Sequence, residues 1–134
     1  MTPFSLKIVT PDGLRYEGPA EELVVRTTTG DLGILAGHIN CVAPLGMGQT
    51  VMLLEGKKRY GACIGGMVSV VDGEVRVVAT SFEWADQIDR ERAAAAEAQA
   101  RAVLSDKKAS TTDIALAEAR LKRALIRQNV ASLK

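Results

Sequence analysis

The chain has 134 residues, of which 47% are hydrophobic and 25% charged, and its formal net charge is +1. This composition fits one ordinary globular domain, or a small domain with an appendage. The chain contains no apolar run of about 18 residues and no charged leader followed by an apolar stretch, which excludes a membrane-spanning or secreted class. We therefore expect a soluble intracellular protein without direct membrane insertion.

Charge divides the chain into two parts near Trp84. Residues 1–83 carry 7 basic and 9 acidic side chains, whereas residues 84–134 carry 10 basic and 7 acidic ones. Beyond Glu118 every charged side chain is basic. We therefore expect a first domain over residues 1–83, a second over residues 84–134, and an anionic partner for the C-terminal end.

The first part reads as short strands. Alternating apolar residues and turn residues predict seven of them, over residues 4–9, 14–17, 22–27, 49–54, 59–64, 67–71 and 74–79. Asp72-Gly73 favours a two-residue type I′ turn, and Glu55 to Lys58 predicts a second hairpin. Short strands at this spacing indicate a β-sandwich or barrel with an aliphatic core.

Between the third and fourth predicted strands lies a glycine-rich stretch from Thr28 to His38. It lacks the Gly-Lys-Ser/Thr ending of a phosphate loop, so we expect a tight, half-buried connection. His38 is the only histidine and cannot assemble a metal site alone, so we expect no metal and a structural, hydrogen-bonded role. Cys41 and Cys63 lack metal-type spacing and are expected to be free, buried thiols.

The second part reads as two helices. Alanine-rich residues 86–103 predict the first, with Asp86 and Asp89 at its start, and an alanine face that buries little area should let it detach easily. Residues 105–109 read as a loop. Ser110 with Asp113 then predicts the start of a second helix that runs to about Val130.

The second helix carries a basic stripe, formed by Arg120, Lys122, Arg123 and Arg127. The three arginines recur at helical spacing beside the apolar face of the helix, so we expect one face to pack and the neighbouring face to be positive. The stripe suits an acidic partner, although a solvated surface that keeps the protein soluble would look the same.

Three motifs occur in order along the chain. A signature loop, Gly30, Gly33, Ile34, Leu35 and His38, has the pattern G-x-x-G-I-L-x-x-H. The glycine pair Gly65-Gly66 before a strand and the helix-opening Ile88-Asp89-x-x-Arg92-Ala93 follow it. In this order the three motifs resemble those of the epsilon subunit of bacterial F-type ATP synthase. Asn40 departs from the family, which often has proline there.

The resemblance implies a flattened N-terminal β-sandwich followed by a C-terminal antiparallel helical hairpin. It implies a non-catalytic rotor subunit of a proton-translocating ATP synthase, at the cytoplasmic face of the bacterial plasma membrane. The sandwich would bind the gamma subunit and the membrane ring of c subunits. The hairpin would inhibit ATP hydrolysis by reaching the alpha and beta subunits through the basic stripe. No nucleic acid and no required cofactor are implied.

In members that bind nucleotide, the resemblance also implies ATP as a regulatory ligand of the folded hairpin. The residues that would bind it are Glu83, Ile88, Asp89, Arg92, Ala93, Arg123 and Arg127. One departure is Gln99, where such members usually carry a further arginine. The alternative is that Asp89 only caps a helix and that Arg92 pairs with Glu97 or with solvent.

Two other classes fit the residues. A free-standing adaptor with a sandwich and a helical hairpin would show the same patterns, but would not co-purify with alpha, beta and gamma subunits. A small hydrolase would need Cys41 as nucleophile and His38 as base. Activity that survives a Cys41→Ala, His38→Ala double substitution would exclude the hydrolase.

Overall fold

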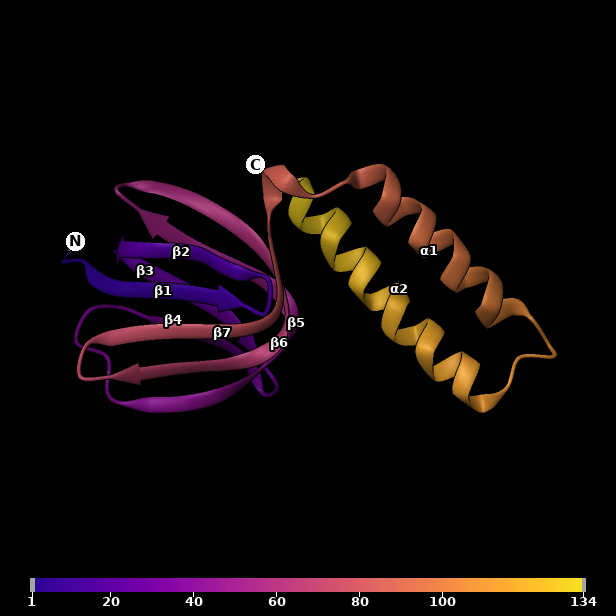
Figure 1. Cartoon of the computed structure of the whole chain (residues 1–134), viewed down its shortest axis with the longest axis horizontal. Coiled ribbons are helices and arrows are strands. Elements are labelled where there is room, and N and C mark those ends of the chain that lie inside the picture. Colours follow the sequence, from indigo (N-terminus) through magenta and orange to yellow (C-terminus); the bar gives the residue numbers. More distant parts are fainter. Residues whose placement is uncertain (1, 134) are drawn as a thin grey trace. The chain divides into compact units, whose positions relative to one another are not determined.

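The computed structural model describes residues 2–133, which form two compact units, Met1–Trp84 and Ala85–Lys134. The first unit contains only strands and the second contains helices (Figure 1). The strands are β1 Phe4–Thr10, β2 Gly13–Ala20, β3 Glu22–Thr27, β4 Gly30–Ile34, β5 Cys41–Leu54, β6 Lys57–Val71 and β7 Glu74–Trp84. The expected order of a β domain before two packed helices is confirmed.

The strands form one sheet in the order β2-β1-β7-β6-β5-β3-β4. Every neighbouring pair is antiparallel except β1 and β7, which run parallel. Leu6 of β1, the second strand in this order, and Ile34 of β4, the last, belong to one buried cluster. The sheet must therefore fold over on itself, which is the two-layered arrangement that the short strands predict.

The core of the sheet unit is aliphatic, as its low aromatic content leads one to expect. Its fully buried members come from β1, β3, β4, β5, β6 and β7 and are Leu6, Ile8, Leu23, Val25, Ile34, Met52, Val68, Val70 and Val77. They alternate along each strand with exposed residues because successive side chains point to opposite faces. One face of each strand is thereby committed to the core.

An aromatic cluster holds the end of β7. The Arg59 guanidinium carbon lies 3.7 Å from the ring centroid of Trp84, and the Phe82 ring meets Trp84 edge to face at 5.1 Å. Tyr16 makes a similar edge contact with Trp84 at 6.3 Å. Such contacts add to the burial of the ring itself. Trp84 therefore packs as the last residue of the sheet unit.

The two hairpin turns are confirmed. Asp72 and Gly73 both have positive φ, 50° and 84°, and Glu55 and Gly56 likewise have 51° and 79°. Two consecutive positive φ values define the type I′ turn that joins twisted antiparallel strands. β6 and β7 pair directly across the first turn, and β5 and β6 across the second.

Three strand predictions are wrong in detail. The residues after Gly30 form strand β4, which pairs with β3, instead of an irregular connection. The strands predicted over residues 59–64 and 67–71 are one strand, β6, which keeps its register with β7 through Gly65 and Gly66. β5 begins at Cys41 rather than at Gln49. These strands contain glycine, and β5 also contains proline, both of which indicate turns or strand ends in a sequence.

The helical unit contains a short 3-10 turn, Ala85–Gln87, and two helices, α1 Arg90–Ser105 and α2 Thr111–Ala131. The predicted start of the first helix at Asp86 is wrong, because Asp89 is the N-cap and accepts a hydrogen bond from the Arg92 amide at 3.0 Å. The predicted capping box of Ser110 and Asp113 is confirmed. The helices pack side by side in opposite directions (Figure 1).

Thr50→Val is expected to stabilise the sheet unit. Thr50 is 1% exposed, and its Oγ1 has no hydrogen-bond partner among residues 2–133. A buried, unpaired hydroxyl costs about 1–3 kcal/mol, so the isosteric valine should raise the free energy of unfolding by about 1 kcal/mol. Thermal unfolding followed by circular dichroism measures the change. The exposed Thr80→Val is the control, and equal melting temperatures for both variants would contradict the prediction.

Candidate functional site

A groove of about 510 Å³ lies between α1 and α2. One wall is formed largely by small side chains of α1, and the other by longer side chains of α2. The lining residues are Ala96, Gln99, Ala100, Val103, Asp106, Lys108, Ala109, Asp113, Leu116, Ala117, Arg120, Arg123 and Arg127. Alanine on the α1 wall leaves room that larger residues would fill.

The groove is positive along its α2 wall. Arg120, Arg123 and Arg127 line it at helical spacing, with Lys108 beside them from the connecting loop, whereas Asp106 and Asp113 each contribute a carboxylate. Guanidinium groups present pairs of N–H donors that match phosphate or carboxylate oxygens. The four cations outnumber the two carboxylates, so the arrangement is suited to a multiply charged anion.

The predicted ATP residues fall into three places. Arg123 and Arg127 line the groove. Asp89 and Arg92 lie at the start of α1, where the Asp89 carboxylate already accepts the Arg92 amide. Ile88 and Ala93, which are close to Asp89 and Arg92 in the sequence, are buried. Glu83 lies on β7 of the sheet unit.

Gln99 lines the groove, and its side chain is the α1 counterpart of the arginines on α2. Its neighbour Arg101 donates from Nε to Glu97 Oε2 at 2.7 Å and is absent from the lining. The position where the resemblance implies an arginine in nucleotide-binding members therefore faces the groove of this chain. Here it supplies an amide instead of a cation.

The basic stripe is divided by the structure. Arg120, Arg123 and Arg127 line the groove, whereas Lys122 is exposed and does not. Sequence reasoning missed Lys108 and Asp113 as lining residues. Asp113 was expected only as a helix cap, and the loop position of Lys108 has no periodicity from which a facing direction could be inferred.

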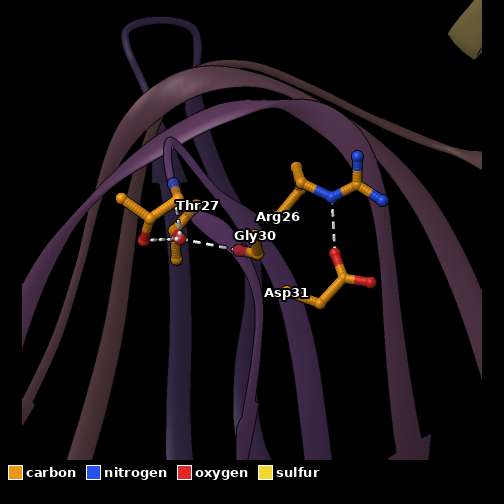
Figure 2. Close-up of polar contacts among 5 residues, drawn as sticks. Arg26, Thr27, Gly30 and Asp31 are labelled. Carbon is orange, nitrogen blue, oxygen red and sulfur yellow. Dashed lines mark hydrogen bonds and ion pairs between the residues drawn. The ribbon is translucent and has the colours of Figure 1, made fainter.

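The signature loop begins as a polar turn between β3 and β4 (Figure 2). The Thr27 hydroxyl donates to the Gly30 carbonyl at 2.6 Å and accepts the Thr29 amide at 3.2 Å. Beside it, Arg26 Nε donates to Asp31 Oδ1 at 2.5 Å, and the two residues face each other across the strands. The two glycines of the motif thus lie in an ordered hairpin, with Gly33 and Ile34 paired to β3.

The rest of the signature loop leads from β4 to β5. Leu35 accepts the His38 amide through its carbonyl, and His38 Nδ1 donates to the Ile39 carbonyl at 2.8 Å. Asn40 binds the turn at Asp72 twice, donating to Oδ1 at 3.3 Å and accepting the Asp72 amide at 2.9 Å. His38 is hydrogen-bonded, as expected, while its structural role stays a prediction. Asn40 links the loop to the β6–β7 turn at the position where the family often has proline.

The two cysteines differ in burial. Both are free thiols as expected, but only Cys63 is buried, whereas Cys41 is half-buried. Burial raises the pKa of Cys63 to about 11, which keeps it protonated at neutral pH. His38, the base required by a hydrolase, uses Nδ1 on the Ile39 carbonyl and shows no hydrogen bond to Cys41. Among residues 2–133 no group of three or more metal-type ligands is found.

Comparison with known proteins identifies close relatives over the full chain. The family model described as ATP synthase, Delta/Epsilon chain, beta-sandwich domain matches residues 3–85. The ATP synthase epsilon chain of Bacillus velezensis is 42% identical over 131 residues, covering 98% of both chains. That of Bacillus cytotoxicus is 42% identical over 134 residues, covering 100% of both.

Solved structures share the fold. A chain of the Euglena gracilis mitochondrial ATP synthase OSCP/F1/c-ring assembly superposes with a TM-score of 0.84 at 26% identity, covering 100% of this chain and 83% of that one. A chain from the Tetrahymena thermophila mitochondrial ATP synthase central stalk and c-ring has a TM-score of 0.61 at 14% identity, which shows the fold alone. Within residues 2–133, neither helix is long and apolar enough to cross a membrane.

Proposed function

The chain belongs to the family of ATP synthase epsilon chains, and from this premise we propose that it couples the catalytic part of a proton-translocating F-type ATP synthase to its membrane ring. The full-length identity of 42% is the observation that carries the proposal. Epsilon chains are non-catalytic subunits of the central stalk. The chain therefore acts by binding its neighbours in the complex, without turnover of its own.

The sheet unit is the part that attaches to the rotor. It would bind the gamma subunit and the ring of c subunits, at the cytoplasmic face of the bacterial plasma membrane. The relative from Euglena belongs to an assembly that contains a c-ring, which supports this attachment. Purification through an affinity tag on this chain tests the attachment. A rotor subunit should co-purify with gamma and c subunits, whereas a free-standing adaptor should not.

The helical unit is the regulatory part. In the folded hairpin, ATP hydrolysis proceeds, whereas an opened hairpin reaches the alpha and beta subunits and blocks it. The basic stripe supports this role because Arg120 and Arg123 are exposed and positive, as contact with an acidic segment requires. The hairpin has 16 residues in α1 and 21 in α2, enough length to change its reach substantially when it opens.

Charge reversal of Arg120, Arg123 and Arg127 to glutamate is expected to weaken inhibition of ATP hydrolysis about tenfold or more. Each exposed ion pair contributes about 1 kcal/mol or less, so the triple change is needed for a clear effect. The measurement is the concentration of this subunit that half-inhibits the complex at low salt. The triple lysine variant keeps the charge and should retain the inhibition that the glutamate variant loses. Equal inhibition by the glutamate variant would refute an acidic partner.

ATP is the ligand that we assign to the folded hairpin. The arginine wall of the groove would hold its phosphates, with Arg123 and Arg127 as bidentate donors, while Ile88 and Asp89 at the start of α1 would receive the adenine. Opening the hairpin would dismantle such a site, because its residues come from both helices. Bound ATP would therefore shift the population toward the folded, non-inhibitory hairpin.

Isothermal titration of the isolated protein with ATP is expected to show one site. The Asp89→Ala, Arg92→Ala double variant should lose it. Conversely, Gln99→Arg adds a cation to the groove and should tighten binding about tenfold, whereas Ala98→Arg, an exposed neighbour outside the groove, should leave it unchanged. No binding to wild type at millimolar ATP would refute the site, and so would equal binding by wild type and the double variant.

A further inference from the structure

Arg90 bridges the two ends of the hairpin. It is the first residue of α1, and its Nη2 donates to the backbone carbonyl of Ala131, the last residue of α2, at 2.5 Å. The last carbonyls of a helix have no partner within the helix and form the negative end of its dipole. The Arg90 guanidinium therefore hydrogen-bonds a carbonyl that has no partner within α2, and its positive charge also complements the negative end of the α2 dipole.

A second polar bridge lies about two turns along α1. Gln128 Nε2 donates to Glu97 Oε1 at 2.8 Å, and Arg101 Nε donates to Glu97 Oε2 at 2.7 Å. These hydrogen bonds lower the pKa of Glu97, the one from Gln128 most, so the acceptor stays a carboxylate at neutral pH. Both bridges join the part of the hairpin where α1 starts and α2 ends.

The remaining contact between the helices is made largely of alanine. The buried residues are Ala93 and Ala100 on α1, with Ala117, Ala124 and Ala131 and the larger Val130 on α2. Alanine buries little apolar area, so each contributes little to holding the helices together. Toward the connecting loop, the groove lined by Ala96 and Arg120 further separates the two surfaces. The polar bridges therefore matter more to the closed hairpin than they would beside a large apolar contact.

We propose that the hydrogen bond from Arg90 to the Ala131 carbonyl, called the clasp below, sets the equilibrium between the closed and the opened hairpin. The hydrogen bond between Gln128 and Glu97 is a second interaction that favours the closed state. Loss of the Arg90 bond removes an interaction that spans 41 residues and that an opened hairpin cannot make. Fixing α1 through the Asp89 cap holds the arginine at the required position. The consequence for ATP hydrolysis depends on the inhibitory role proposed above, whereas the clasp itself does not.

Hydrogen exchange of the full-length protein, resolved by mass spectrometry, tests the clasp. Arg90→Met is expected to speed exchange about fivefold along α2, including the amides of Ala117 and Ala124, because a detached helix loses the packing that stabilises its backbone hydrogen bonds. Arg90→Lys keeps a cationic donor group, so its exchange rate along α2 should lie between those of wild type and Arg90→Met. Lys107→Met removes an exposed cation at the other end of the hairpin and should match wild type.

Two results would overturn the clasp. One is exchange along α2 at the wild-type rate in Arg90→Met. The other is faster exchange confined to the last turn, near Ala131, which would make Arg90 a helix cap only. Circular dichroism must show the same helix content for wild type and for Arg90→Met. Gln128→Ala is a second variant, which removes the Gln128–Glu97 bridge and leaves Arg90 in place.

Inhibition of ATP hydrolysis is measured separately in the assembled complex. Arg90→Met is expected to inhibit about fivefold more strongly, because more of the subunit is open. If exchange along α2 rises and inhibition does not, the clasp stands and the proposed inhibitory role of the hairpin fails. If exchange does not rise, the clasp fails whatever the inhibition.

Discussion

Deletion of residues 86–134 is expected to leave a folded sheet unit and to release ATP hydrolysis from inhibition. The retained chain keeps all seven strands, the shared core and the cluster around Trp84. Because the helices contribute nothing to the pairing of these strands, their loss should not unfold the sheet. Circular dichroism and thermal melting report the fold, and the hydrolysis rate of the complex reports the release.

A shorter variant that ends at Glu83 serves as the control. It lacks Trp84, whose ring packs against Arg59, Phe82 and Tyr16. Removal of a buried tryptophan costs about 3–5 kcal/mol, so this variant should melt far below the one that ends at Ala85. An unfolded longer variant would contradict the independence of the sheet unit. A complex that stays inhibited with the longer variant would contradict the role of the hairpin.

Gly66→Ala is expected to lower the free energy of unfolding by about 3 kcal/mol or more. Gly66 has φ +121°, a conformation that other residues rarely adopt, and an added Cβ would clash with the Val78 carbonyl and the Ala79 Cα on β7. These are backbone atoms of the paired strand, so they cannot rotate away as a side chain would. Urea unfolding followed by circular dichroism measures the loss.

Gly73→Ala is the matched control on the same hairpin. Gly73 also has a positive φ, +84°, but an added Cβ there meets no atom within 4 Å. Only the strain of the left-handed conformation remains, about 1–2 kcal/mol. Equal destabilisation by the two substitutions would mean that the close approach of β6 and β7 at Gly66 contributes nothing.

The local signals in the sequence were read correctly where the chemistry is local. Asp72-Gly73 forms a type I′ turn because aspartate and glycine are among the few residues that accept positive φ, and the predicted hairpin at Glu55 to Lys58 forms around Gly56. Ser110 and Asp113 form a capping box because both partners lie within one helical turn. These elements depend on neighbours three or four residues away, which the sequence displays directly.

The errors arose where a distant partner decides the structure. Gly65 and Gly66 look like a turn, yet β6 continues through them because β5 and β7 pair with it on both sides. Asp86 and Asp89 are equally good caps in isolation, but residues 85–87 contact α2 as a 3-10 turn, and the helix therefore starts after Asp89. A prediction from spacing has no access to such contacts.

The candidate site shows the same division. Helical spacing alone puts Arg120, Arg123 and Arg127 on neighbouring positions of one helix, and the alanines of α1 predict a helix that buries little area. Only the antiparallel packing of α1 on α2 brings Gln99 and Lys108 to the same groove as those arginines and joins Arg90 to Ala131. Spacing along one helix is set by its pitch, whereas contact between two helices is set by how their surfaces pack, and that requires both.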